Sequence, residues 1–303
     1  MLSRIVRVAL ALSMVLGASS VVAQTQDDGL MMQKRVLSAG VFYTHDRWDH
    51  YWEGTLKRTN GNIGALTQQT VTSIVGYGVS DRLSVMAMVP YVQTHASQGV
   101  LHDLRGLQDL TVSAKLKLLT TGASLRGALS AFVVGTAAVP VGDYTPDFFP
   151  LSIGTGGGRA SGRLTLSYQS PSAWFVNASS AFTFCSNIKL NRNSYYTDGQ
   201  LYMTNEVSMP NVVDYTLTAG VSRGRWRIPV SLVQQRTLGG GDIRRQDMPF
   251  VSNRMDFTKL DGGVMYALPK NLSIKLGAAH VLNGRNVGQS TTFTSGLVYA
   301  HRF

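Results

Sequence analysis

A short stretch near the N-terminus contains side chains that could bind a metal ion. It reads His45-Asp46-Arg47-Trp48-Asp49-His50, and its two His and two Asp residues are ligand types for a divalent cation. The stretch lies in the first long connection predicted below, between residues 45 and 65. A solvated loop without a metal is the simpler interpretation, so we assign no metal site and leave open whether this loop binds one.

Two other kinds of chemistry leave traces in the sequence without forming a motif. The glycine-rich stretches 154–158 and 239–241 lack a following Lys-Ser or Lys-Thr pair, so they are not phosphate-binding loops. Phospholipases of the serine type need a Ser, a His and a polar orienting residue held together. Although Ser, His and Asn are abundant, no arrangement singles out such a triad. We therefore predict no catalytic residue and no cofactor.

The N-terminus has the organisation of a secretory signal peptide. Arg4 and Arg7 precede an apolar run over residues 8–16, and Val21-Val22-Ala23 supplies a small-residue cleavage pattern. We predict that residues 1–23 are removed and that residues 24–303 form one domain. The single Cys185 cannot form a disulfide within the chain, so the secreted protein depends on another means of stabilisation.

The rest of the chain shows a period of two, which is typical of β-strands. In residues 109–118, for example, Leu110, Val112 and Leu116 alternate with Lys115 and Lys117. About twelve strands are predicted, at residues 35–44, 66–79, 82–93, 106–119, 125–139, 158–169, 173–186, 211–222, 225–236, 254–268, 271–282 and 290–303.

The connections between these strands alternate strictly between short and long. Tight turns, such as Ser80-Asp81-Arg82 and Ser170-Pro171-Ser172, alternate with longer connections, such as 140–157 and 187–210. Outer-membrane barrels have short periplasmic turns and long outer loops, and lipid requires the sheet to close on itself. The fold class is therefore all-β: an antiparallel, up-and-down transmembrane β-barrel in a bacterial outer membrane.

Aromatic residues and the C-terminus agree with this interpretation. Aromatic side chains gather at the two ends of the predicted strands, as expected where a barrel crosses the two membrane interfaces. The chain ends in Phe303 after alternating apolar residues, which resembles the assembly signal of bacterial outer-membrane barrels. Expected partners are outer-membrane lipid and lipopolysaccharide, the barrel-assembly machinery through Phe303, and a small-molecule solute. The net charge of +11 is spread along the strands, so nucleic-acid binding is not predicted.

Two segments resemble a specific family. A strand, tight turn and strand ending in Pro-Tyr runs from Gly76 to Val92, and Gly106-Leu107-Gln108-Asp109 then opens the next strand. This order, clearest over residues 76–169, resembles the outer-membrane barrel family labelled "putative meta-pathway of phenol degradation", regarded as distantly related to the long-chain fatty-acid transporters. The resemblance implies uptake of small hydrophobic or aromatic compounds. The fatty-acid transporters also have an N-terminal plug domain, and residues 24–34 are too few to form one.

The alternation predicts which side chains face the interior of the barrel. The predicted pore-lining residues are Asp109, Lys115, Lys117, Arg159, Arg163, Arg227, Lys275, Met86, Met88 and Phe132. Asp109 is about six residues from Lys115 along the strand, roughly 20 Å, so both Lys115 and Lys117 are predicted to be unpaired.

This mixture of cations and apolar groups leaves two main functions open. The leading hypothesis is a channel for passive uptake of small hydrophobic or aromatic compounds. The alternative is an anion-selective porin for acidic sugars or other small anions, favoured by the basic interior. A phospholipase-type enzyme and a structural or adhesive barrel are weaker alternatives.

Overall fold

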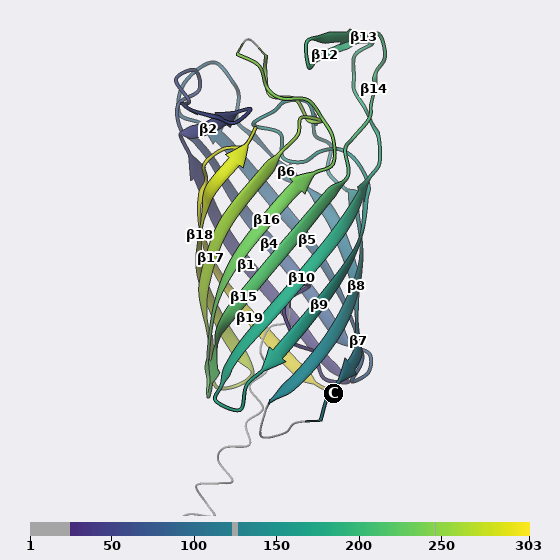
Figure 1. Cartoon of the computed structure of the whole chain (residues 1–303), viewed down its shortest axis with the longest axis vertical. Coiled ribbons are helices and arrows are strands. Elements are labelled where there is room, and N and C mark those ends of the chain that lie inside the picture. Colours follow the sequence, from purple (N-terminus) through teal and green to yellow (C-terminus); the bar gives the residue numbers. More distant parts are fainter. Residues whose placement is uncertain (1–24, 123–126, 246) are drawn as a thin grey trace, which may run out of the picture.

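The protein is a single closed β-barrel, as a computed structural model shows (Figure 1). The structure describes residues 25–122, 127–245 and 247–303. The predicted signal peptide, residues 1–23, lies outside the described residues. Within the described part, no helix is long and apolar enough to cross a membrane.

Twelve antiparallel strands form the barrel wall, which confirms the predicted fold class. They are β1 (Val36–Trp48), β4 (Leu66–Gly78), β5 (Leu83–Ala96), β7 (Asp109–Thr120), β8 (Ala128–Pro140), β9 (Arg159–Gln169), β10 (Trp174–Cys185), β15 (Val212–Arg223), β16 (Trp226–Thr237), β17 (Asp256–Ala267), β18 (Leu272–Arg285) and β19 (Thr291–Arg302). Each pairs with its neighbour in the chain, and β1 pairs with both β4 and β19, which closes the barrel.

Two details of the strands differ from the prediction. β1 extends to Trp48, so His45 and Asp46 belong to a barrel strand and not to the first long loop. The predicted strand 106–119 is divided at Gln108 into β6 (Leu104–Leu107) and β7, both of which pair with β5.

Six short strands in the outer connections were not predicted. They form three pairs: β2 (His50–Glu53) with β3 (Leu56–Thr59), β11 (Ile188–Lys189) with β14 (Glu206–Val207), and β12 (Tyr195–Thr197) with β13 (Gln200–Tyr202). Strands of two to four residues are too short for alternation to reveal them.

The two faces of the wall follow the alternation in the sequence. On β7, Ser113 and Lys115 are buried in the interior, whereas Val112, Ala114 and Leu116 are exposed on the outside. The exposed side chains are those that meet lipid, because a membrane barrel places its apolar residues outward. The burial of these side chains on β7 thus follows the alternation in the sequence.

Aromatic side chains mark the two ends of the barrel. At the end with the short turns and the C-terminus (bottom of Figure 1), the Tyr168 and Trp174 rings lie 5.1 Å apart and those of Trp226 and Tyr266 lie 4.4 Å apart. At the other end Tyr91, Phe182, Phe184, Tyr215 and Phe293 point outward and are exposed. Short turns identify the first end as periplasmic and the second as outer.

A charge on the lipid face should destabilise the barrel. Leu164 is outward, 50% exposed and near the middle of β9, so Leu164→Arg places a cation in the apolar band. We expect a loss of about 2–4 kcal/mol in the free energy of unfolding, measured by urea titration in lipid vesicles. The control is Leu201→Arg in the outer hairpin, which is 63% exposed and should change stability little. Equal stability of both variants would contradict the lipid-facing assignment of β9.

Candidate functional site in the barrel interior

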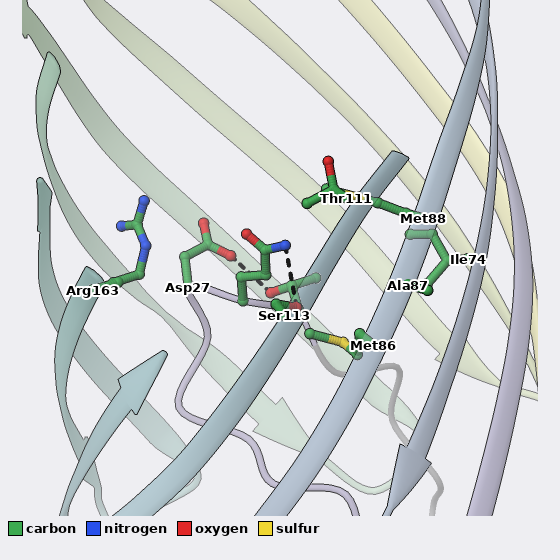
Figure 2. Close-up of a pocket in the computed structure, with 10 residues that line it drawn as sticks. Asp27, Ile74, Met86, Ala87, Met88, Thr111, Ser113 and Arg163 are labelled. Atoms are coloured by element: carbon green, nitrogen blue, oxygen red, sulfur yellow. Dashed lines mark hydrogen bonds between the residues drawn. The ribbon is translucent and has the colours of Figure 1, made fainter. Parts of the chain in front are cut away.

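The N-terminal segment, residues 25–34, precedes the first strand and lies inside the barrel. The Gln26 side-chain amide donates a hydrogen bond to Ser113 on β7 at 3.4 Å, and the segment passes beside Met86 on β5 (Figure 2). Gly29 is so close to Ser167 on β9 and Asn177 on β10 that a Cβ there would collide with both side chains. The segment therefore spans the interior. It is too short for a plug domain, but the prediction did not place it in the barrel at all.

Lys115 holds this segment through three oxygen atoms. Its Nζ donates to the Thr25 carbonyl at 3.0 Å, to the Asp28 carbonyl at 2.6 Å and to the Asp28 carboxylate at 2.8 Å. Its side chain is completely buried, and Nζ lies 5.2 Å from the centre of the Phe132 ring. The prediction that Lys115 is unpaired is wrong, because its partner comes from outside the strands. Lys117, on the same face, has no carboxylate within 4 Å among the described residues.

Two further interior cations are paired across strands. Arg159 on β9 binds Asp109 on β7 at 2.6 Å, and Arg163 binds Asp214 on β15 at 2.6 Å. Asp109 is only 2% exposed, so its charge depends on the arginine for compensation. These pairs join neighbouring parts of the wall and neutralise the positive charge of two of the predicted interior cations.

Arg227 and Lys275 lie on the other side of the segment. The Arg227 guanidinium is 3.7 Å from the centre of the Phe175 ring, and Lys275 Nζ is 5.9 Å from that of Phe42. Both cations line a small cavity of about 110 Å³, into which the carboxylates of Asp27, Asp28 and Asp261 also face. The segment thus brings two carboxylates to a region where the wall itself supplies mostly cations.

An apolar pocket lies between the segment and strands β4, β5 and β7. It has a volume of about 280 Å³, and the side chains of Ile74, Met86 and Met88 form one wall of it (Figure 2). The opposite wall is polar. It consists of Thr25, Gln26, Asp27, Thr111, Ser113 and Arg163. Of the ten predicted interior residues, Met86, Met88 and Arg163 meet here.

An outer loop packs against the outer ends of β5 and β7. In the connection between β8 and β9, the Tyr144 hydroxyl donates to Asp109 at 2.7 Å, and Thr94 on β5 donates to the Leu151 carbonyl at 2.7 Å. Leu151 is fully buried. Burial and the bond to Asp109 raise the pKa of Tyr144 well above its usual range, so the phenol stays protonated.

The candidate metal ligands do not come together. The Asp46 carboxylate accepts a hydrogen bond from Thr292, and the His50 ring bonds to Asp49. Among the described residues, no group of three or more His, Cys, Asp or Glu side chains could hold a metal ion.

The closed barrel, its outward apolar side chains and its charged interior define an outer-membrane β-barrel. The chain belongs to the family described as "Putative MetA-pathway of phenol degradation", whose model matches residues 55–296. This confirms the resemblance found in the sequence. The N-terminal segment precedes the matched residues.

Solved structures show the same fold at low sequence identity. The chain is similar to the COG4313 outer membrane channel from Pseudomonas putida F1, with a TM-score of 0.71 and 16% identity over 92% of this chain and 100% of that chain. It is also similar to the translocator domain of the autotransporter NalP from Neisseria meningitidis, with a TM-score of 0.50 and 11% identity over 99% and 98% of the two chains. No curated protein matches the sequence.

Proposed function

We propose that the protein is a channel for passive uptake of small hydrophobic or aromatic compounds across the outer membrane. The observation that carries the proposal is the pocket inside the barrel, where Ile74, Met86 and Met88 form an apolar wall opposite a polar one. An apolar wall with a few polar groups opposite it is the usual composition of a small-molecule site. Membership of a family named for phenol degradation supports this solute class.

The alternative, an anion-selective porin, rests on the basic interior. Lys115, Arg159 and Arg163 each have a carboxylate partner, which weakens the attraction that free cations would exert on anions. Conductance in a planar bilayer separates the two functions, because an anion porin would conduct strongly and select for anions.

The channel proposal includes no enzymatic activity. It includes contact of the outer rim with lipopolysaccharide and recognition of Phe303, which is 70% exposed, by the barrel-assembly machinery.

Replacing the two methionines by a polar residue should reduce uptake selectively. In Met86→Gln/Met88→Gln proteoliposomes we expect toluene uptake to fall about tenfold. Full burial of a Met side chain is worth roughly 1.5–3 kcal/mol, and apolar contact with each Met gives a bound solute part of this stabilisation. Ion conductance should stay close to the wild-type value. The control is Thr72→Gln, an interior change on β4 that does not line the pocket. Unchanged toluene uptake in the double variant would count against this route.

A further inference from the structure

Two long outer connections fold into a common lobe above the barrel rim. Ile188, Tyr195 and Val207, from the connection between β10 and β15, pack with Phe250 and Val251, from the connection between β16 and β17. All are at most 7% exposed. Figure 1 shows β12 and β13 standing above the rim in this lobe. Because it has its own buried core, the lobe can hold side chains in fixed positions.

Three aromatic rings form a continuous stack in the lobe. The Phe250 and Tyr195 rings lie 5.1 Å apart at 18°, and the Tyr195 and Tyr202 rings lie 5.0 Å apart at 11°. Arg192 closes the Phe250 end, with its guanidinium 5.8 Å from the ring centre. Tyr195 is 7% exposed, because it is sandwiched, whereas Tyr202 at the other end is 37% exposed. The stack can therefore accept one more ring at Tyr202.

A cavity of about 520 Å³ adjoins this stack. Tyr195, Tyr202, Pro210 and Leu238 contribute ring and apolar surface to its lining. Its volume falls within the range of small-molecule sites. Leu238 is 55% exposed, so part of this apolar lining is open to solvent.

Polar groups in the same cavity define what the ligand carries. Thr197, Ser208 and Ser252 line the cavity, and none of their hydroxyls makes a hydrogen bond within the described residues. The carboxylate in the lining, Asp198, is paired with Arg244 at 2.9 Å. A ligand in this cavity can therefore hydrogen-bond to hydroxyl groups, and the carboxylate in the lining is already paired with an arginine.

We propose that this cavity is an outer receiving site for a small, uncharged, planar aromatic compound bearing a polar group such as a hydroxyl. The ring extends the stack at Tyr202 and packs against Leu238 and Pro210, and the polar group bonds to the hydroxyls. The solute class rests on the proposed function. Binding at the lobe is separate from passage through the barrel, so each can fail without the other.

The test uses the full-length protein in lipid nanodiscs and phenol as the probe. Fluorotyrosine is placed at position 202 in one sample and at position 196 in another, and the fluorine signals are followed by NMR during a phenol titration. Tyr196 lies on β12, which pairs with β13, the strand of Tyr202. It is 55% exposed but does not line the cavity, which makes it a matched control. We expect a saturable shift at 202 and none at 196, and a much smaller shift at 202 with cyclohexanol, which has the hydroxyl without the aromatic ring.

Variants give a second readout that does not depend on the label. Tyr202→Ala should weaken phenol binding about 3- to 10-fold, whereas Tyr202→Phe and Tyr196→Ala should bind as wild type does. Equal shifts at 202 and 196, or undiminished binding by Tyr202→Ala, would overturn the inference even if vesicles take up phenol. A shift confined to 202 in a protein whose vesicles take up no aromatic compound would support this site and reject the proposed function.

Discussion

Lys115→Met is expected to release the N-terminal segment and to raise the ion conductance of the barrel several-fold. The change removes the donor shared by the Thr25 carbonyl and by both the carbonyl and the carboxylate of Asp28. Removing one partner of a buried ion pair typically costs about 3–5 kcal/mol, because the other charge is left buried and alone. Asp28 can avoid that cost by moving into water, and the segment leaves the interior with it. Single-channel recordings in a planar bilayer measure the result.

Lys117→Met provides the matched control for this experiment. Lys117 lies two residues further along β7 on the same interior face, carries the same charge and makes no ion pair or hydrogen bond with the described residues of the segment. Its loss removes the same unit of charge without freeing the segment, so the conductance should change much less than in Lys115→Met. If Lys115→Met conducts as wild type does, or if both variants conduct equally more, the segment is not held by Lys115.

The strands could be predicted because their signal is local and repeated. Alternation over about ten residues, bounded by turns, placed all twelve barrel strands within a few residues of their observed ends. The identity of the inward residues followed from the same alternation, as Ser113 and Lys115 against Val112 and Leu116 show. A transmembrane barrel allows this because lipid and the polar interior act on every strand in the same way.

The candidate site could not be predicted in the same way, since its contacts join distant parts of the chain. Residues 25–34 have no period and precede the first strand, and only the adjacent acids Asp27 and Asp28 hinted at a basic partner. Lys115 can be identified as that partner only from the closed barrel, because the barrel brings Lys115 next to Asp28, which is 87 residues away in sequence. The pairing of Arg163 with Asp214, 51 residues apart, has the same origin.

The acidic pair of the segment should control ion selectivity. In the wild type, Asp27 and Asp28 face Arg227 and Lys275 across the small cavity, and Asp28 also pairs with Lys115. Asp27→Asn/Asp28→Asn keeps the size of both side chains but removes both negative charges. The interior cations then face fewer carboxylates, so we expect the ratio of chloride to potassium permeability to rise several-fold. Reversal potentials in a potassium chloride gradient measure this ratio.

A second double variant shows whether position or total charge decides the outcome. Asp103→Asn/Asp143→Asn removes two exposed carboxylates from outer connections, so the net charge changes by the same amount. Salt screens exposed charges over about 10 Å at 0.1 M, whereas charges in a narrow interior act directly on a passing ion. We therefore expect the outer variant to keep the wild-type reversal potential. If the two variants shift it equally, total charge decides the selectivity. If neither shifts it, ions do not pass beside the N-terminal segment.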